Sequence, residues 1–483
     1  MITLLQEFPL LKTIGDFANQ HDQEVYVVGG FVRDYLLHRL ENEKGGQEID
    51  FVVVGDGIQF ATALARHLRV AKPTVFQKFG TAMLRWQGQQ LEFVGARKES
   101  YRGDSRKPEV EPADLSTDLA RRDFTINAMA VALHAPDAGR LHDPFEGRTD
   151  LQAGVIRTPL EPGATFNDDP LRLMRGIRFA AQLQFKIETK TFAAMAAMRE
   201  RLGIISQERI TEELLKIVAV PKPSIGFDLL DKSGVLQIIL PELVELKGVE
   251  EYAGYQHKDV FNHTLMVLNN LSSVSDKIPL RLAALFHDIA KPRTKEFKPG
   301  KGWTFHGHED VGGRMIPPIF RRLKLPMEWS NYVQKLTRLH LRPIALTEEE
   351  CTDSAYRRLL FQAGEDLEDL LTLCRSDITS GNAQRRKQHL ENFDFVVRRL
   401  NEVEEKDRMR AFQSPVRGDE IMTLCQLQPG PLVGKLKTAI EEAILEGVIP
   451  NEHGAARAYL LNIKDEIMAQ APQASLNYAE TFD

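Results

Sequence analysis

Strand-like patterning is confined to the first third of the chain, and this distribution constrains the fold more than any other feature. Short runs rich in β-branched and aromatic residues occur before residue 155, among them VYVV, IDFVVV, TAMLRW and QLEFVG. Beyond Pro170, apolar residues recur at helical spacing to about residue 466. We therefore predict an α+β fold, in which a mixed-sheet head is followed by an elongated all-α body.

The chain has 483 residues, more than one hydrophobic core usually serves. Proline and glycine interrupt the helical pattern at PKPSIG, near IPLR and at QLQPGPLVG. We place domain boundaries near residues 155, 245 and 415. The polar segment from Arg97 to Asp118 cannot bury much surface, so we expect a mobile loop that serves as a flap.

Charge and cysteine content limit the possible partners and the cellular compartment of the protein. A net charge of −6 argues against a generally basic surface for nucleic acid, so any RNA contact must come from a local cluster of lysine and arginine. Cys351, Cys374 and Cys425 include no CxxC pair, which excludes a disulfide framework and suits a reducing cytosol. No basic leader and no apolar run of roughly 18 residues occurs. We expect a cytoplasmic protein without a membrane span.

A glycine pair lies between the first predicted strand and a helix, in VYVVGGFVRDYLL. Gly29 and Gly30 would let backbone amides approach a phosphate at the positive end of the new helix, and Arg33 adds positive charge. Most Gly-Gly turns after strands are simply turns. The pair by itself therefore leaves both interpretations open.

Three carboxylates follow the alternation of the predicted strands. In EIDFVVV, Glu48 and Asp50 lie two residues apart and share one face, whereas Ile49 and Phe51 point into the core. Glu92 has the same setting in LEFVG. Neighbouring carboxylates repel unless a cation neutralises them, and oxygen ligands of this kind suit Mg²⁺. The alternative is a solvent-facing acidic surface of the sheet.

Arginines recur every three residues in NDDPLRLMRGIRF. Arg172, Arg175 and Arg178 would form a cationic ridge on one helical face, with Asp169 near its amino end. The earlier segment RRDFTINAMA also joins arginine to aspartate. A solvated, salt-bridged helix face and an ion pair at a helix start are the alternatives to a ligand site.

Four motifs occur in an order and spacing that resemble the class II tRNA nucleotidyltransferase and bacterial poly(A) polymerase family, within the DNA polymerase beta superfamily: GGFVRD, EIDFVVV, RRDFTINAMA and NDDPLRLMRGIRF. The similarity extends through FVGARKESYR to the GVIPNE tail, and it covers the whole chain. It implies a nucleotidyltransferase head (1–155), a helical neck for nucleotide selection and RNA binding (156–245), an HD domain (246–415) and a helical tail that contacts tRNA (416–483).

The resemblance implies template-independent addition of C, C and A to the 3′ end of tRNA from CTP and ATP, with release of pyrophosphate. The 3′ hydroxyl would attack the α-phosphorus, with two Mg²⁺ held by Glu48 and Asp50 and with Glu92 as general base or further ligand. The family usually has Asp-x-Asp on this strand. Since the extra methylene displaces the Glu48 carboxylate, Asp50 is the firmer metal ligand.

The same resemblance assigns nucleotide-binding residues. Arg122 would meet the phosphates, while Asp123 and Asn127 would hold the sugar. Asp169 and Arg172 would form a protein template that pairs with the base edges, and the two later arginines of the ridge would face the phosphates. The complete predicted set is Gly29, Gly30, Arg33, Arg122, Asp123, Asn127, Asp169, Arg172, Arg175 and Arg178.

Histidines and aspartates in helical segments after residue 246 follow the H…HD…D order of the HD superfamily, in FNHTLMVL, LAALFHDIAKP and CRSDITS. Further histidines occur in FHGHED and LHLRP. Imidazole favours Mn²⁺, Fe, Ni²⁺ or Zn²⁺ over Mg²⁺ alone. Buried structural histidines are the alternative. The predicted ligands of two metal ions are His263, His287, Asp288, His308, His340 and Asp377.

The expected function is thus CCA addition, with tRNA, CTP and ATP as partners and with no obligate protein partner. A poly(A) polymerase or an enzyme that adds only A is the nearest alternative. A phosphohydrolase acting on RNA ends through the HD domain is a second alternative, and a non-catalytic RNA-binding protein is a third. The full set of head motifs argues against the last.

Overall fold

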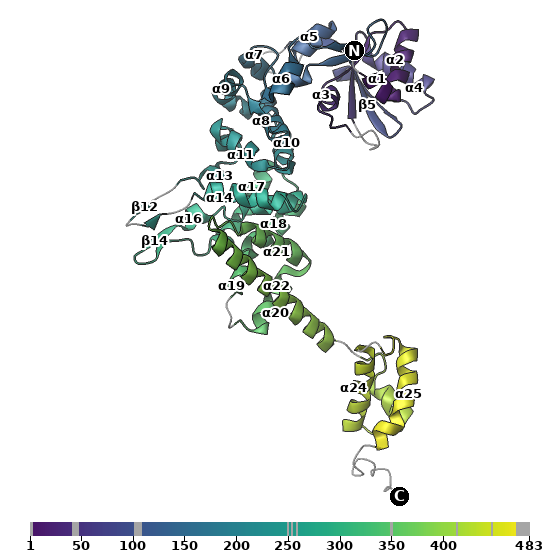
Figure 1. Cartoon of the computed structure of the whole chain (residues 1–483), viewed down its shortest axis with the longest axis vertical. Coiled ribbons are helices and arrows are strands. Elements are labelled where there is room, and N and C mark those ends of the chain that lie inside the picture. Colours follow the sequence, from purple (N-terminus) through teal and green to yellow (C-terminus); the bar gives the residue numbers. More distant parts are fainter. Residues whose placement is uncertain are drawn as a thin grey trace. The chain divides into compact units, whose positions relative to one another are not determined.

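The computed structural model describes residues 3–40, 48–100, 109–248, 251–252, 255–256, 259–347, 351–411, 414–445 and 448–469. The chain divides into two compact units. The first comprises residues 1–345 and 363–390, and the second comprises 346–362 and 391–483. Figure 1 labels their elements. No helix within the described ranges is long and apolar enough to cross a membrane.

A seven-stranded mixed sheet forms the head of the first unit, with strand order β3-β4-β5-β2-β1-β8-β9. Its strands are β1 (Val25–Val28), β2 (Glu48–Val53), β3 (Thr74–Phe76), β4 (Thr81–Trp86), β5 (Gln89–Gly95), β8 (Ala130–Ala132) and β9 (Leu141–His142). Strands β2 and β5 run parallel, and the other neighbouring pairs are antiparallel. The predicted mixed-sheet head is confirmed.

Alternation along the central strands separates two faces of the sheet. On one face Phe51 stacks on Phe93, with ring centroids 4.7 Å apart, and Phe60 packs beside them. Phe60 belongs to α4 (Gly57–His67). The other helices of the head are α1 (Leu4–Glu7), α2 (Pro9–Gln20), α3 (Gly30–Leu36), α5 (Leu115–Ala120) and α6 (Gly147–Ala153).

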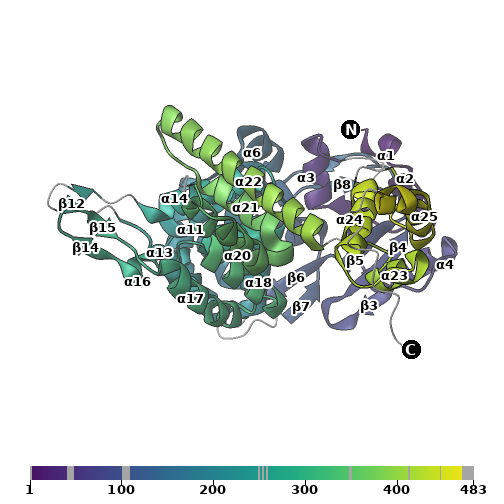
Figure 2. The same ribbon diagram turned by 90° about the horizontal axis from the view of Figure 1, so that it is seen from below.

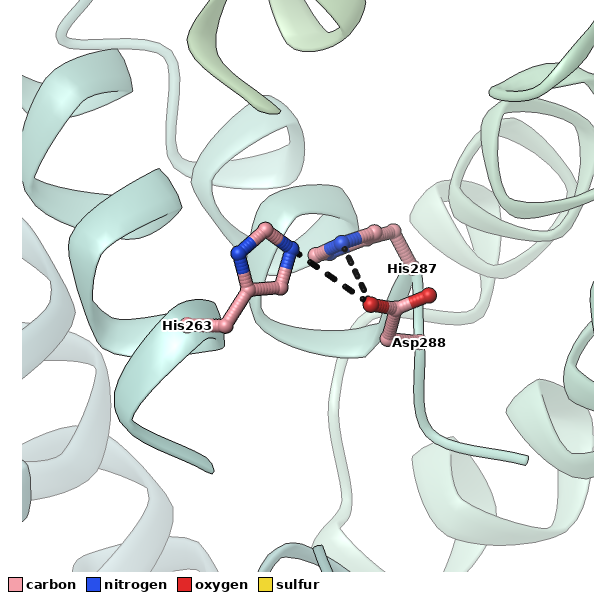
Figure 3. Close-up of side chains that lie close together, drawn as sticks. All are labelled: His263, His287 and Asp288. Carbon is pink, nitrogen blue, oxygen red and sulfur yellow. Dashed lines mark ion pairs between the residues drawn. The ribbon is translucent and has the colours of Figure 1, made fainter. Parts of the chain in front are cut away.

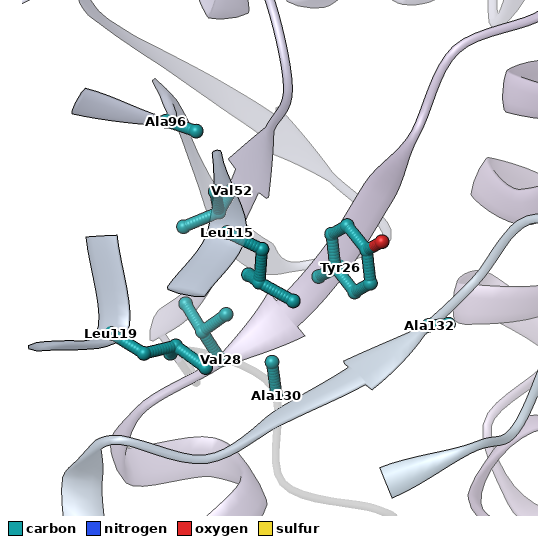
Figure 4. Close-up of a cluster of buried hydrophobic side chains, with 8 residues drawn as sticks. All are labelled: Tyr26, Val28, Val52, Ala96, Leu115, Leu119, Ala130 and Ala132. Carbon is teal, nitrogen blue, oxygen red and sulfur yellow. The ribbon is translucent and has the colours of Figure 1, made fainter. Parts of the chain in front are cut away.

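Helix α5 covers part of the opposite face, which also carries the acidic residues. Its Leu115 and Leu119 pack on an apolar cluster from the strands (Figure 4). Val52 of this cluster lies two residues after Asp50, so both side chains belong to the same face. The cluster consists of Tyr26, Val28, Val52, Ala96, Leu115, Leu119, Ala130 and Ala132.

The segment predicted as a loop is partly ordered, and the prediction is wrong for those parts. Strands β6 (Arg97–Ser100) and β7 (Glu109–Pro112) pair antiparallel. Helix α5 then begins after Asp114, whose carboxylate accepts a hydrogen bond from the amide of Thr117. Pairing satisfies the backbone of a polar hairpin without an apolar pattern, which is why periodicity did not reveal it. Residues 101–108 lie outside the described residues, so the flap stays a prediction.

The rest of the first unit is mainly helical, as expected. After the head come α7 (Pro162–Asp168), α8 (Leu171–Leu183), α9 (Thr189–Met198), α10 (Gln207–Ala219), α11 (Pro223–Lys232), α12 (Val235–Ile239) and α13 (Pro241–Val244). These are followed by α14 (Val260–Ser272), α15 (Ile278–Phe286), α16 (Lys291–Thr294), α17 (His308–Leu323), α18 (Met327–Leu339), α19 (Arg342–Ala345) and α21 (Leu367–Asp377).

Short strand pairs and 3₁₀ turns interrupt these helices, so the body is not purely helical. The pairs are β10 (Val155–Ile156) with β11 (Lys186–Ile187), β12 (Glu251–Tyr252) with β13 (Tyr255–Gln256), and β14 (Glu296–Lys298) with β15 (Gly302–Thr304). The last two hairpins lie side by side (Figure 2). The 3₁₀ turns of the unit are η1 (Gln77–Phe79), η2 (Thr125–Asn127), η3 (Arg199–Ile204) and η4 (Gly364–Asp366).

The second unit is built from α20 (Asp353–Ala363), the long α22 (Ala383–Ala411), α23 (Gly418–Cys425), α24 (Pro431–Leu445) and α25 (His453–Ala469), although the first residues of α22 belong to the first unit. Arg399 joins α22 to α20 through an ion pair with Asp353 at 2.8 Å. Helices α23 to α25 share an apolar core around Leu436 and Leu460. Residues 470–483 of the predicted tail lie outside the described residues.

A buried arginine of α15 holds the end of α10 against the end of α14. Arg281 is only 1% exposed. Its Nη1 donates to the carbonyls of Val218, Ala219 and Val220 at 3.0, 2.8 and 3.0 Å, and its Nη2 donates to the carbonyl of Ser272 at 3.2 Å. Carbonyls at a helix end have no partner within the helix. The Arg281 side chain therefore supplies hydrogen-bond donors to carbonyl groups that are buried at the end of α10.

Arg281→Met is expected to lower the free energy of unfolding by about 3 kcal/mol, because it leaves several buried carbonyls without a donor. Urea unfolding of the full chain measures this change. The matched control is Arg293→Met, because Arg293 is exposed and lies 4.0 Å from Glu245. Equal effects of the two substitutions would show that the buried contacts of Arg281 contribute nothing specific.

Candidate active site

The structure brings together the three carboxylates predicted from strand alternation. Asp50 in β2 lies directly opposite Glu92 in the parallel strand β5, and Glu48 lies opposite Gln90. Gln90 Nε2 donates to Glu48 Oε1 at 3.1 Å. One oxygen from each of the three acids lies within 4.8 Å of the others. Such a set of oxygen donors fits a hard divalent cation.

Burial and mutual repulsion make the ionised form of this triad unfavourable. Burial raises the pKa of Asp50, Arg122 opposes this change, and Glu48 adds to it. Burial likewise raises the pKa of Glu92, and the charges of Asp50 and Glu48 raise it further. A cation bound between the carboxylates would reverse both effects. The electrostatics therefore support a metal site more than a solvated acidic surface.

Gly29 allows a guanidinium to approach the triad. Its φ of 73° lies in the left-handed region, and α3 begins at the next residue, Gly30. A side-chain Cβ at Gly29 would lie 3.2 Å from Nη1 of Arg122 and 3.6 Å from Oδ2 of Asp50. The absence of a side chain thus leaves room between the strand, the helix and Arg122.

Helix α5 positions two arginines at this point. Asp118 is fully buried and accepts hydrogen bonds from Arg121 Nη2 at 2.7 Å and from Arg122 Nη2 at 3.1 Å. Burial opposes ionisation of Asp118, but Arg122 and Arg121 hold its pKa below the usual value. The packing of α5 on the sheet, together with this carboxylate, therefore fixes Arg122 near Asp50.

Asp123 lies at the centre of a buried polar network. It accepts hydrogen bonds from Arg175 Nε at 2.8 Å and from Asn127 Nδ2 at 3.1 Å, and Arg33 Nη1 donates to Asn127 Oδ1 at 2.8 Å. Burial alone would raise the pKa of Asp123, but Arg175 and Asn127 lower it to about 2. Hydrogen bonds through Asp123 and Asn127 therefore connect three segments that are far apart in the sequence.

These residues surround a cavity with a volume of about 740 Å³. Glu48, Glu92 and Arg178 are not among the residues that line it. The cavity is also lined by Arg97, Arg121, Asp168 and Phe179, which the sequence analysis did not assign to the site. Only Phe179 carried a signal, because it follows Arg175 by four residues in a helix. The predicted residues that line the cavity are Gly29, Gly30, Arg33, Asp50, Arg122, Asp123, Asn127, Asp169, Arg172 and Arg175.

The proposed template residues are held by hydrogen bonds of their own. Asp169 Oδ2 accepts a hydrogen bond from Arg209 Nη2 at 3.0 Å. Arg172 is 8% exposed, and its guanidinium donates to the carbonyls of Thr165 and Arg121 at 3.2 and 2.6 Å. Asp169 and Arg172 therefore both line the cavity, but neither has all of its polar atoms directed into it.

A second cluster gathers the histidines and aspartates after residue 246. Four imidazole Nε2 atoms surround Asp288: those of His263 and His287 lie 3.5 and 3.1 Å from its Oδ2 (Figure 3), and those of His308 and His340 lie 3.2 and 3.7 Å from its Oδ1. Asp288 therefore belongs to two possible sets of metal ligands. One set also contains His263 and His287, and the other contains His308 and His340.

Asp377 completes the cluster from the last residue of α21. Its Oδ1 lies 2.8 Å from His263 Nε2 and 3.6 Å from His287 Nε2. The structure therefore brings all six predicted ligands to one place. His306, the other histidine of FHGHED, is exposed and takes no part in the cluster.

Contacts of the second ring nitrogen, Nδ1, hold the four imidazole rings in their orientation. Nδ1 of His287, His308 and His340 lies 2.8, 2.8 and 2.7 Å from a backbone carbonyl three residues earlier in the chain. His263 Nδ1 lies 2.9 Å from Thr379 Oγ1. When Nδ1–H donates to a carbonyl, Nε2 carries the lone pair that binds metal, which is the usual arrangement around metal-ligating histidines.

His287 Nε2 is buried, and its charged neighbours are Asp288 Oδ2 at 3.1 Å and Asp377 Oδ1 at 3.6 Å. Burial opposes its charged form, yet Asp288 raises the pKa of His287 to about 10, and His287 in turn holds the pKa of Asp288 well below its usual value. Burial and the charge of His287 lower the pKa of His340 to about 4. Four imidazoles whose Nε2 atoms gather around one buried carboxylate fit a transition-metal site better than a purely structural core.

Models of three protein families match the chain in order. A "Poly A polymerase head domain" matches residues 25–157, a "Probable RNA and SrmB- binding site of polymerase A" matches 184–246, and an "HD domain" matches 260–380. The carboxylate triad and the histidine cluster fall within the first and third ranges, respectively.

Curated relatives are similar to this chain over most of their length. The chain is 32% identical to an A-adding tRNA nucleotidyltransferase of Deinococcus radiodurans, over 74% of this chain and 81% of the relative. It is 34% identical to a multifunctional CCA protein of Nitrosococcus oceani, over 73% and 84%. It is 30% identical to a CC-adding tRNA nucleotidyltransferase of Thermus thermophilus, over 94% and 97%.

Solved structures agree with this similarity. A tRNA nucleotidyltransferase complexed with a primer tRNA and an incoming ATP analogue matches with a TM-score of 0.56 and 25% identity, over 81% of this chain and 99% of that structure. An apo CCA-adding enzyme, 23% identical, has a TM-score of 0.56 over 94% of this chain and 95% of its own, and it supports the fold alone.

Proposed function

Because the chain belongs to the tRNA nucleotidyltransferase and poly(A) polymerase family, we propose that this enzyme adds CCA to the 3′ end of tRNA from CTP and ATP. One observation carries the proposal. Asp50 and Gly30 line not only the cavity of about 740 Å³ but also a second cavity of about 510 Å³, which includes Arg39 and Gln182. A triphosphate in the first and an RNA end in the second would meet at Asp50.

In the proposed reaction the 3′ hydroxyl oxygen forms a bond to the α-phosphorus, and the bond to the departing pyrophosphate breaks. Glu48 and Asp50 are the residues that would hold Mg²⁺, which when bound activates the hydroxyl and neutralises the leaving group. Glu92, with its raised pKa, is suited to take the hydroxyl proton or to complete the ligand set. Arg122 neutralises phosphate charge beside them.

The remaining polar groups of the large cavity orient the nucleotide. Asp123 and Asn127 offer acceptors and donors to the ribose, and Arg33 and Arg175 offer positive charge to the triphosphate. Asp169 and Arg172 would pair with the base edge. Since the Arg172 donors are already bonded to backbone carbonyls, base reading requires that at least one of them is released.

Asp169→Ala and Arg172→Ala are each expected to reduce discrimination against UTP and GTP about 10- to 100-fold, because they remove hydrogen bonds to the base edge. Single-nucleotide incorporation into tRNA with each of the four triphosphates measures this ratio. Arg140→Ala is the control, since this exposed residue pairs with Asp137 away from the cavity. If both variants reject UTP and GTP as the parent does, the template role is misplaced.

One experiment tests the proposed function as a whole. Transcripts of tRNA that end before, within and after CCA are incubated with Mg²⁺ and each nucleotide. The proposal expects C, C and A to be added in that order, and a complete end to be left unextended. Addition of the terminal A alone, of the two Cs alone, or of repeated A to any RNA would instead indicate an A-adding enzyme, a CC-adding enzyme or a poly(A) polymerase.

The histidine cluster favours a second activity in the same chain. We propose that the HD domain hydrolyses a phosphoester at RNA ends, such as a 2′,3′-cyclic phosphate or a 2′-phosphate. His263, His287, Asp288, His308, His340 and Asp377 are the residues that would hold the metal. Bound Mn²⁺, Fe, Ni²⁺ or Zn²⁺ lowers the pKa of a ligand water and so supplies the nucleophile.

We further propose that the helices after the head, in the range 156–245, select the nucleotide and bind RNA, because α8 contributes Arg172 and Arg175 to the large cavity. The helical tail, in the range 416–483, is proposed to contact tRNA. Shortening the chain after Pro415 would then raise the KM for tRNA more than the KM for CTP.

A further inference from the structure

Three guanidinium groups converge on one aromatic ring beside the large cavity. The Cζ atoms of Arg33, Arg175 and Arg178 lie 5.1, 5.4 and 4.0 Å from the ring centroid of Phe179. Phe179 itself is 4% exposed, and it lines the cavity together with Arg33 and Arg175. A buried ring shared by three cations is unusual, because one such pair occurs roughly once per 70–80 residues.

Each of the three cations also has a carboxylate partner. Arg33 pairs with Asp34 at 2.8 Å. Arg175 pairs with Asp123 at 2.6 Å, and Arg178 pairs with Glu213 at 2.6 Å. The three carboxylates belong to different segments, and each is paired with one arginine, so no carboxylate in these pairs joins two of the guanidiniums. Among these contacts, the aromatic ring, whose faces carry partial negative charge, is the one group that attracts all three cations.

The ring and its cations come from two parts of the fold. Arg33 belongs to α3 of the head, whereas Phe179, Arg175 and Arg178 belong to α8. The only aromatic ring among the described residues that packs against Phe179 is Phe124, with centroids 6.0 Å apart and planes at 82°. The ring of Phe179 thus contacts both Arg33 of the head and the two arginines of α8.

We infer that Phe179 is a positioning residue for the triphosphate: its aromatic face holds Arg33 and Arg175 at the spacing that the phosphates require. This inference rests on the proposed nucleotidyl transfer. A leucine at position 179 would fill much of the same apolar volume, but it has no negative face. Without the aromatic face, the guanidiniums of Arg33 and Arg175 would be held by their carboxylates and not by the ring, and they could turn away from the nucleotide.

Phe179→Leu is expected to raise the KM for CTP and ATP about tenfold and to leave kcat within about threefold, because the arginines bind the triphosphate in both ground state and transition state. Phe179→Tyr keeps the face and should restore most of the affinity. The control is Phe227→Leu, which removes a fully buried ring from α11, outside both cavities. It should lower the melting temperature without changing KM.

A sharper test separates the ring's charge distribution from its shape. Phenylalanine with one, two or three ring fluorines at position 179 keeps nearly the same volume while the negative face is progressively weakened. The KM and the calorimetric Kd for ATP are expected to rise in that order. A flat series, or an effect of Phe179→Leu on melting temperature alone, would overturn the inference and leave the ring as ordinary packing.

Failure of the proposed function is distinguishable from failure of this inference. A parent enzyme that binds ATP but adds no nucleotide to tRNA would contradict the proposed function, whereas the Kd series would still support or overturn the role of Phe179. A parent that binds neither ATP nor CTP at millimolar concentration would overturn both.

Discussion

Asp50→Asn is expected to reduce nucleotide incorporation at least about a thousandfold, because it replaces a charged metal ligand by a neutral amide at the meeting point of the two cavities. The same substitution should not lower the melting temperature. The apolar neighbours Ile49 and Phe51 are untouched, and burial together with the repulsion from Glu48 already makes the Asp50 carboxylate unfavourable without a cation. Loss of activity with retained stability is therefore the expected signature.

Incorporation of labelled CTP into a tRNA transcript measures the rate, and a thermal melt without Mg²⁺ measures stability. The control is Asp137→Asn, which makes the same chemical change at a partly exposed position paired with Arg140. Retained incorporation by the Asp50 variant, with a normal melting curve, would refute the metal assignment.

Glu48→Asp tests the departure from the family pattern. Glu48 is exposed and accepts a hydrogen bond from Gln90. Shortening it restores the usual acid on this strand, so the incorporation rate should stay the same or improve. A loss of about a hundredfold or more would show that this chain requires the longer side chain.

The second large effect is expected in the histidine cluster. His287→Ala combined with Asp288→Ala should remove the bound metal and eliminate phosphoester hydrolysis, while nucleotide addition survives. Asp288 is the carboxylate around which four imidazoles are arranged, so its loss disrupts both potential ligand groups. The triad of the head shares no residue with this cluster.

Metal analysis of protein purified without chelator, followed by a phosphatase screen with added Ni²⁺ or Mn²⁺, measures both properties. Because His287 and Asp288 are almost fully buried, the double variant is compared with His263→Ala, whose side chain is 23% exposed and whose replacement disturbs the core less. Both variants should lose hydrolysis. If the parent contains no metal and hydrolyses nothing, the cluster is structural and the helices around it serve to position the tRNA.

Local patterns in the sequence predicted much of the fold and part of each site. Alternation placed Ile49 and Phe51 in the core, and the structure confirms this placement. Helical spacing predicted α8 with its arginines. Both predictions concern residues within four positions of each other, where strand and helix geometry alone decide which side chains share a face.

Other features depended on how distant segments pair. The parallel register of β2 and β5 places Glu92 beside Asp50, although 42 positions separate them in the chain. The hairpin of β6 and β7 escaped prediction because backbone pairing, not apolar periodicity, defines it. The six predicted ligands of the histidine cluster come from five separate segments of the chain, and only the packing of these segments brings the ligand atoms together.

The sequence alone thus determined the element types, the buried faces and the chemical class of the ligands, because these follow from local geometry and from the resemblance of motifs. Tertiary structure decided which side-chain donors are already hydrogen-bonded within the protein and which cations contact the same aromatic ring. Arg172 was predicted to pair with base edges, and nothing in the sequence indicated that its guanidinium also donates to the backbone carbonyls of Thr165 and Arg121. The sequence assigned no role to Phe179. Its contact with three cations depends on the packing of α3 against α8, because Arg33 and Phe179 belong to different helices.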